Sequence, residues 1–283
     1  MFKVCNKQTT DISKISFQYL CQLVYQHSAI VLDASKDYLA ELHLKPIAET
    51  AGFDSLNSFV EHLRSQPFGN LHVRAIEALS ITETSFFRDR HPFEVLKNFT
   101  LPELISRRAK ERSLKIWCGA CSSGQEPYSL AILIREHFPL LTTWDLQIIA
   151  SDFSSQILAR ARQGRYKQWE IQRGLPADLR EKYFQFQQQQ QNWEIKDQIR
   201  QMVEFRQINL IHPWLSMPAM DVIFLRNVLI YFDTDTKKST LKKVRQQLRP
   251  DGYLFLGGSE TTIYLDESFE RIQQEGGVCY RLR

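Results

Sequence analysis

The 283-residue sequence lacks any run of eighteen or more apolar residues, which excludes a helix that spans a membrane. Its N-terminal residues also lack the apolar core of a secretion signal, so we expect a cytoplasmic protein with no membrane-inserted part. A strong excess of one charge is missing too. The chain holds 36 Lys and Arg against 32 Asp and Glu, and a net charge of +4 is too small to indicate a nucleic-acid partner.

Cysteine is scarce, with five residues at irregular positions, so no disulfide framework is expected. Cys118 and Cys121 form an isolated C-x-x-C pair. A zinc site would need two further ligands, and the seven histidines show no paired motif, so the sequence predicts no metal. A redox pair at this position is conceivable, but small residues that fill a loop are the preferred interpretation.

One stretch is basic and contains no acidic residue between its members, which are Lys237, Lys238, Lys242, Lys243, Arg245 and Arg249. The preferred interpretation is a solvated helix face. A weak attraction for an acidic partner is the alternative.

The first part of the chain has the apolar spacing of amphipathic helices, i, i+3, i+4 and i+7. The residues that show it are Phe17, Leu20, Cys21 and Val24, followed by Leu56, Phe59, Val60 and Leu63. Pro46, Gly52 and the cluster at 67–70 are expected to separate the helices. We therefore predict an all-α domain over residues 1–85, of which roughly the first 12 residues form a tail.

From residue 114 onward the pattern alternates between strands and helices. Strands are predicted at 114–117, 146–152, 221–225 and 253–257, and helices at 127–137, 154–161 and 236–248. Such repeated units indicate an α/β fold with a mostly parallel sheet, closed at its end by a hairpin over 269–282. We assign this domain to 86–283. The segment at about 164–205 interrupts it, as either a polar loop or a small β-insertion.

The most informative segment is a strand, a loop of small residues with two glycines, and a helix that opens at Pro127, over residues 116–131. This geometry lets a nucleotide-type cofactor approach the backbone closely. An ordinary βα connection is the alternative, because the loop matches neither the dinucleotide-binding nor the phosphate-loop pattern.

Two further features follow strands that should end at the same sheet edge. Asp152 could accept hydrogen bonds from both hydroxyls of a ribose, or it could cap the next helix. The segment 226–232 adds guanidinium, amide and phenol groups there. Together with the loop, these features indicate an adenosine-type cofactor beside a reaction chamber.

Five motifs resemble those of the chemotaxis receptor glutamate methyltransferases, the CheR family. They are 82–88 (TETSFFR), the loop 117–129, 150–152 (ASD), 209–210 (NL) and 226–232 (RNVLIYF). The turn 248–252 (LRPDG) is shared more widely by S-adenosylmethionine-dependent methyltransferases. The resemblance implies an all-α domain followed by a Rossmann-like class I methyltransferase sheet with a small antiparallel β-subdomain, which favours the β-insertion.

The resemblance also implies which residues bind S-adenosylmethionine, with S-adenosylhomocysteine as product and without a metal. Asp152 is expected on the ribose hydroxyls and Glu126 near the methionine ammonium. The remaining cofactor contacts it implies are Thr82, Thr84, Arg88, Asn209, Leu210, Asn227 and Val228. Thr82 stands where many relatives have asparagine, and Thr84 matches the motif.

Arg88 and Tyr231 are implied at the methyl-transfer centre. A substrate glutamate has a pKa of about 4.3, so it is ionised at neutral pH and needs no general base. The two side chains would position the carboxylate. Since tight binding by Arg88 would lower the reactivity of that carboxylate, a contact with the cofactor's own carboxylate is the alternative for Arg88.

The function implied is methyl transfer to glutamates of methyl-accepting chemotaxis receptors, by a monomer that binds the receptors' cytoplasmic domain. Two alternatives remain open: a related methyltransferase with another acceptor, and an S-adenosylmethionine-binding sensor or scaffold without catalysis.

Overall fold

The computed structural model describes residues 12–80, 82–214 and 217–283, and these form two compact units. The helical unit contains the described residues up to position 80 together with Tyr231–Asp233. The sheet unit contains Thr82–Ile230 and Thr234–Arg283. Nearly all of the predicted N-terminal tail lies outside the described residues. Among those residues, no helix combines the length and apolar character needed to cross a bilayer.

The helical unit is built from amphipathic helices whose apolar faces form its core. They are α1 (Lys14–Ser28), the 3-10 turn η1 (Ala34–Lys36), α2 (Asp37–Thr50), α3 (Leu56–Ser65) and α4 (Asn70–Leu79). The predicted periodicity marks buried positions, since Phe59 and Val60 are fully buried and Leu63 nearly so. Ser55 caps α3 by accepting a hydrogen bond from Ser58 N at 3.1 Å.

Pro46 was expected to separate helices, and this is wrong because it lies inside α2. A proline there removes one helical hydrogen bond. The buried face of α2, formed by Ala40, Leu44 and Ala48, supplies packing on both sides of the proline and keeps the helix continuous.

The sheet unit contains a seven-stranded sheet in the order β6-β2-β1-β7-β8-β10-β9. Its strands are β1 (Ser113–Gly119), β2 (Asp145–Asp152), β6 (Val203–Gln207), β7 (Met220–Leu225), β8 (Leu248–Leu256), β9 (Phe269–Gln274) and β10 (Gly277–Leu282). The five strands from β6 to β8 pair in parallel, and β10 pairs antiparallel with β8 and β9. The predicted α/β class, the mostly parallel sheet and the closing hairpin are confirmed.

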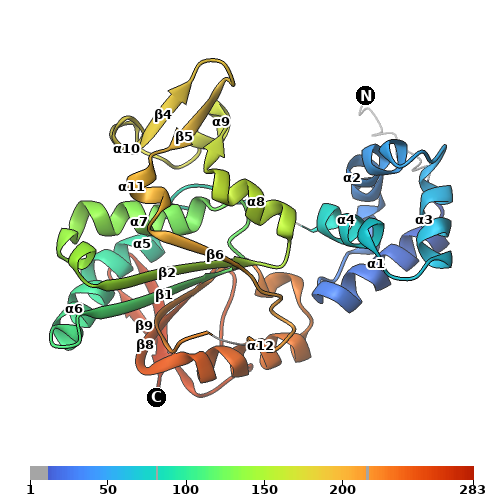
Figure 1. Ribbon diagram of the computed structural model, residues 1–283. Coiled ribbons are helices and arrows are strands. Elements are labelled where there is room, and N and C mark those ends of the chain that lie inside the picture. The colour runs from blue at the N-terminus through green and yellow to red at the C-terminus, as the bar shows by residue number, and fades with distance from the viewer. Residues whose placement is uncertain (1–11, 81, 215–216) are drawn as a thin grey trace, which may run out of the picture. The chain divides into compact units, whose positions relative to one another are not determined.

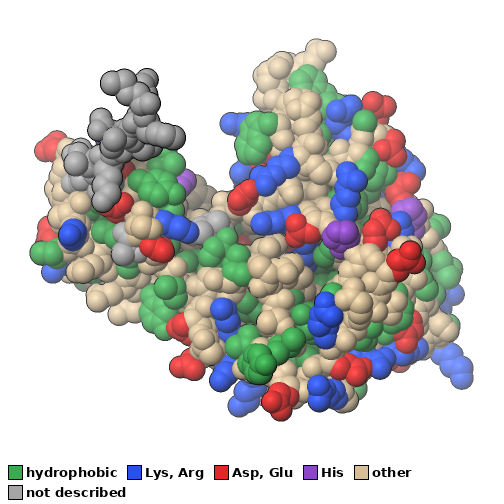
Figure 2. All heavy atoms as spheres, turned by 180° about the vertical axis from the view of Figure 1, so that it is seen from behind, with side chains coloured by type: hydrophobic (Ala, Val, Ile, Leu, Met, Phe, Trp, Pro, Cys, Tyr) green, Lys and Arg blue, Asp and Glu red, His purple; other side chains and the backbone are tan. Residues whose placement is uncertain are grey.

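Helices cover both faces of this sheet: α7 and α8 lie on one face and α12 on the other (Figure 1). The helices of the unit are α5 (His91–Val95), the π-helix η2 (Leu96–Thr100), α6 (Leu101–Arg108), α7 (Gln125–His137), η3 (Pro139–Thr143), α8 (Ser155–Gln163), α9 (Gln168–Gln172), α10 (Ala177–Tyr183), α11 (Asp197–Arg200) and α12 (Thr234–Gln247). The short 3-10 turn η4 (Leu229–Tyr231) begins in this unit, and its last residue belongs to the helical unit. In the view of Figure 2, basic and acidic side chains are interspersed, and neither sign covers a continuous area.

The interruption at about 164–205 is a small antiparallel sheet, so the polar-loop interpretation is wrong. Its strands are β3 (Arg165–Tyr166), β5 (Asn192–Ile195) and β4 (Phe184–Gln187), in that order. This sheet stands out from the main sheet beside α9 and α10 (Figure 1).

Two sheet elements differ from the prediction. The residues of β6 were assigned partly to the insertion, but β6 is the outermost parallel strand of the main sheet. Its sequence VEFRQ carries charged residues, as is common in an edge strand that has a neighbour on one side alone. The turn expected at 249–252 lies within β8, where the pairing with β7 shifts register between Met220 and Val222.

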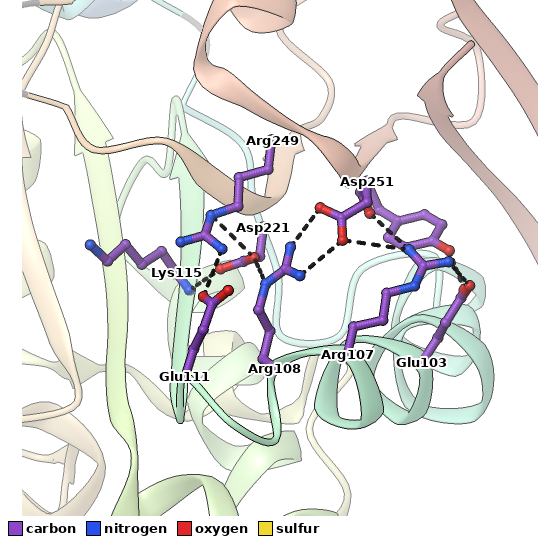
Figure 3. Close-up of polar contacts among 9 residues, drawn as sticks. Glu103, Arg107, Arg108, Glu111, Lys115, Asp221, Arg249 and Asp251 are labelled. Atoms are coloured by element: carbon purple, nitrogen blue, oxygen red, sulfur yellow. Dashed lines mark hydrogen bonds and ion pairs between the residues drawn. The ribbon is translucent and has the colours of Figure 1, made fainter.

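Figure 3 shows an ion-pair network around Arg108. Since Lys115 and Asp221 lie near the starts of β1 and β7, the network is at the amino-terminal edge of the sheet, opposite the edge where the predicted loops lie. Arg108, at the end of α6, reaches between two carboxylates of neighbouring strands. Its Nε lies 2.8 Å from Asp221 Oδ1, and its Nη2 lies 2.6 Å from Asp251 Oδ1. Asp221, fully buried, also accepts from Lys115 N at 2.8 Å. The network therefore joins α6 to β1, β7 and β8.

Arg108 gives the stability of the sheet unit a pH dependence. Its hydrogen bond to Asp251 lowers the pKa of that carboxyl group. A carboxyl group with a lowered folded-state pKa stabilises the protein above its unfolded pKa of about 4, and this stabilisation is lost as pH falls through the folded value. We expect the Tm of wild type to exceed that of Asp251→Asn near neutral pH, with the gap narrowing as pH falls to about 3. Calorimetry across that range tests this; a gap independent of pH would contradict it.

Candidate functional site

The predicted site residues of the sheet unit gather beyond the carboxyl ends of its parallel strands. From β1 the chain continues to β2 and β6 on one side, and it returns later to β7 on the other side. In such open sheets, ligands bind in the crevice where the connections diverge, here beyond β1 and β7. The loops after β1, β2, β6 and β7 all meet at this edge.

The loop between β1 and α7 is a tight turn with a strained backbone. Ala120 (φ 54°), Ser122 (φ 49°) and Gly124 (φ 92°) all lie in the left-handed region. Cys121 N donates to Ser151 O at 2.8 Å, which ties the loop to the end of β2. Gly124 is required, because a Cβ at its positive φ would meet Tyr128, Ala161 and Tyr166 at 3.2 Å. Strain of this kind is typical of ligand-binding turns.

The helix after this loop begins at Gln125, two residues before the predicted start. Pro127 nevertheless lies in the first turn, where its missing N–H leaves no helical hydrogen bond unmade.

Asp152, at the end of β2, holds the loop in place. Its Oδ2 accepts from Ser122 N at 2.9 Å, and its Oδ1 accepts from Ser154 N at 3.1 Å. Ser154 is the N-cap of α8, with its side chain accepting from Ile157 N. The helix-cap interpretation of Asp152 is therefore wrong, and this nearly buried carboxylate faces the loop instead.

Glu126, in the first turn of α7, forms an ion pair with Arg226 at the end of β7. Its other oxygen accepts from Cys118 Sγ at 3.1 Å. The Arg226 side chain is fully buried, and it also contacts Asp89 Oδ2 at 2.8 Å and Arg88 O at 3.0 Å. Arg226 thus joins α7, β7 and the turn at residues 88–89 through its guanidinium.

The segment that carries Thr82, Thr84 and Arg88 is fastened to the loop. Ser122 Oγ donates to Thr82 O at 2.7 Å, and Arg88 Nη1 donates to Glu83 O at 2.9 Å. Thr82 is exposed, whereas Thr84 and Arg88 are half-buried. The segment therefore lies against the β1–α7 loop, which brings these three predicted residues to the same edge as Asp152.

Lys243 of α12 supports the loop that contains Asn209 and Leu210. Its Nζ donates to Leu210 O and to His212 O, the latter at 3.2 Å, and it lies 5.1 Å from the ring centre of Trp214. Burial lowers the pKa of Lys243. Leu210 itself is buried.

The solvated-face interpretation of the basic stretch is therefore wrong for Lys243. Arg245 donates to Ser268 Oγ at 2.5 Å, but its side chain is 40% exposed, as expected for a solvated face. Arg249 lies in β8 rather than on the helix, and its Nη1 lies 3.1 Å from Glu111 Oε2.

The turn after β7 contains the last predicted residues. Asn227, with φ 57°, and Val228 donate their backbone N–H groups to the carboxylate of Glu260. Tyr231 belongs to the helical unit, where its carbonyl accepts from Val31 N at 2.8 Å. Its place at the transfer centre therefore stays a prediction.

The C-x-x-C pair lies in the core rather than at a reactive surface. Cys118 and Cys121 are at most 2% exposed, and burial raises the pKa of both thiols well above the ordinary value. Neutral buried thiols are poor nucleophiles, which supports their interpretation as small filling residues. Within the described ranges, no three His, Cys, Asp or Glu side chains are grouped so as to hold a metal ion.

Two family models match the chain. The CheR methyltransferase SAM-binding domain matches residues 82–278, and the CheR methyltransferase all-alpha domain matches residues 15–80. The chain belongs to the CheR methyltransferase family. It is thus a methyltransferase that depends on S-adenosylmethionine, and the two matched segments fall in the sheet unit and the helical unit.

Curated relatives within the CheR family align over almost the whole chain. The chain is 37% identical to "Chemotaxis protein methyltransferase Cher2" of Pseudomonas putida, over 95% of this chain and 98% of that protein. It is 40% identical to "Chemotaxis protein methyltransferase 1" of Pseudomonas aeruginosa, over 90% and 93%. A protein of the latter name from Vibrio cholerae is 35% identical, over 96% and 98%.

Reasoning from the sequence did not identify three residues that hold the predicted site residues in place: Arg226, Lys243 and Glu260. Arg226 and Lys243 were noticed only as members of a polar segment and a basic stretch. Their partners lie far away in sequence, so spacing carries no signal for them. Glu260 lies four residues after the end of β8, in the sequence Gly257-Gly258-Ser259-Glu260. This position at the carboxyl edge of the sheet is the signal that could have drawn attention to it.

The two carboxylates that face Arg226 should differ in their importance for stability. Glu126 is 12% exposed and Asp89 47% exposed. We expect Glu126→Gln to lower the free energy of unfolding by about 2 kcal/mol, since it leaves a buried guanidinium without its buried counter-charge. Asp89→Asn, the matched control, should cost less than about 1 kcal/mol. Thermal unfolding measures both, and a larger loss for Asp89→Asn would refute this assignment.

Proposed function

We propose that this CheR-family enzyme transfers the methyl group of S-adenosylmethionine to glutamate side chains of methyl-accepting chemotaxis receptors. The observation that carries the proposal is the near-complete alignment with chemotaxis protein methyltransferases, together with the motif residues gathered at one sheet edge. We place the reaction in the cytoplasm, where a monomer would meet the receptors' cytoplasmic domain.

The residues at this edge fit the cofactor chemically. The carboxylate of Asp152 suits the hydroxyl donors of a ribose, and the buried side chain of Leu210 suits an adenine ring. Asn209, next to Leu210, would contribute to the adenine contact. Glu126 suits the methionine ammonium, with its charge shared between that group and Arg226.

The remaining contacts we assign are to the peptide-like part of the cofactor. Thr82, Thr84 and Arg88 would approach it from the segment fastened to the loop, and Asn227 and Val228 would approach it from the turn after β7.

The chemistry asks the protein mainly for positioning. When bound, S-adenosylmethionine supplies a methyl group already activated on a sulfonium. A glutamate acceptor is ionised at neutral pH because its pKa is about 4.3, so no residue has to remove a proton. The chain's task is to hold the carboxylate in line and to exclude water. We assign that positioning to Tyr231 and to Arg88, whose other possible partner is the cofactor's carboxylate.

The test uses purified protein, S-adenosylmethionine labelled in its methyl group and the cytoplasmic domains of several cognate receptors. We expect label on the receptor that alkali releases as methanol, because methyl esters are base-labile whereas methylated amines are not. Base-stable label would indicate another acceptor. Tight cofactor binding by calorimetry without any transfer would indicate a sensor or scaffold.

A further inference from the structure

We infer that Glu260 is a positioning residue, whose carboxylate holds the turn at 227–230 in the shape that receives the cofactor. The inference rests on the proposed function, since it takes Asn227 and Val228 as cofactor contacts. Glu260 is itself assigned no contact with cofactor or acceptor.

The carboxylate of Glu260 is saturated by backbone donors. Its Oε2 accepts from Gly257 N at 2.6 Å and from Asn227 N at 2.8 Å. Its Oε1 accepts from Val228 N at 2.9 Å and from Ile230 N at 3.2 Å. The residue is only 8% exposed. One side chain beyond β8 therefore satisfies three N–H groups of the turn that follows β7.

Gly257 lies so close to Asn227 and Glu260 that a residue with a side chain would not fit at its position. A Cβ on Gly257 would lie 2.7 Å from Asn227 Nδ2 and 2.8 Å from Glu260 Oε2. Glu260 N donates in turn to Gly257 O at 2.9 Å, which closes a tight turn after β8. Asn227, at φ 57°, has the left-handed backbone that presents its N–H to this carboxylate.

A carboxylate is needed here, and an amide of the same shape would not replace it. All four partners are N–H donors, two on each oxygen. In either orientation, a glutamine would turn its NH2 group toward two of these donors and leave both without an acceptor. Buried donors without an acceptor are costly, so the turn would rearrange to find other partners.

Such a rearrangement would move the backbone of Asn227 and Val228 at the edge where β7 ends. A binding residue that loses its supporting hydrogen bonds binds less well even though its own side chain is unchanged. Since these residues are assigned to cofactor binding, the loss should raise the KM for S-adenosylmethionine more than it lowers kcat.

Isothermal titration calorimetry of Glu260→Gln with S-adenosylmethionine tests the inference, with the full chain and no acceptor. We expect Kd to rise about tenfold or more, with one binding site per molecule retained. The control is Glu267→Gln, which removes the same charge from an exposed position seven residues further along the chain and should bind as wild type does. A purely structural role would instead lower the number of sites and leave Kd unchanged.

A Kd for Glu260→Gln within twofold of the wild-type value would overturn the inference, as would a loss of sites alone. If that variant does not fold, Glu260→Asp and Gly257→Ala disturb the same contact from its two sides and are judged by the same criteria. Failure of the proposed function gives a different result, because wild type itself would then bind no S-adenosylmethionine or transfer no base-labile methyl group.

Discussion

Replacing Asp221 with asparagine is expected to lower the free energy of unfolding of the sheet unit by about 3 kcal/mol, roughly 6–12 °C in Tm. The Asp221 side chain is fully buried and faces Arg108, whose own side chain is 7% exposed. Asparagine keeps the shape but removes the charge, and one of its two terminal atoms becomes a donor. Either Arg108 Nε or Lys115 N then loses its acceptor.

The matched control for this prediction is Glu111→Gln. Glu111 belongs to the same network through Arg249, but its side chain is 54% exposed. Glu111→Gln should therefore lower the free energy of unfolding by less than about 1 kcal/mol. Because the network lies at the edge opposite the proposed cofactor site, the folded fraction of Asp221→Asn should bind S-adenosylmethionine as wild type does. Equal Tm values for the two variants would contradict the account of this network.

Replacing Asp152 with asparagine is expected to weaken S-adenosylmethionine binding by about 100-fold, or close to 2.7 kcal/mol. Two effects add. Hydrogen bonds from ribose hydroxyls to a carboxylate are stronger than those to a neutral amide. Ser122 N and Ser154 N also donate to opposite oxygens of Asp152, so the NH2 group of an asparagine would face one of them and leave it without its acceptor.

Asp145→Asn is the control, since Asp145 begins the strand that Asp152 ends and is exposed. Its affinity should equal that of wild type in the same calorimetric titration. A change of less than threefold for Asp152→Asn would show that the carboxylate does not contact the cofactor. Circular dichroism before the titration establishes that both variants are folded.

Much of the fold could be predicted from the local spacing of apolar residues, because that spacing reflects which side chains are buried. The apolar runs of β1 and β7 are buried on both faces of the sheet, so they read as strands without reference to the rest of the chain. The spacing of Leu56, Phe59 and Leu63 reports the buried face of α3 in the same way. β6 was missed because an edge strand with alternating charges has no such signal.

The candidate site could be predicted only in part. Residues whose position along the chain suggests a role were found, and residues that act through distant partners were not. Glu126 and Asp152 sit at strand and helix ends, where position alone suggests a role. Arg226, Lys243 and Glu260 act through partners that folding brings to them, often backbone atoms, which no residue pattern encodes. These supports determine how the predicted residues are held, and they became visible only in three dimensions.

The central claim is tested most directly by following methyl transfer to a receptor's cytoplasmic domain as the concentration of labelled S-adenosylmethionine is raised, for wild type and for Asp152→Asn. We predict alkali-labile label with wild type, and the same label with the variant only at much higher cofactor concentration. Label that resists alkali, or no transfer by wild type to any cognate receptor, would contradict the account.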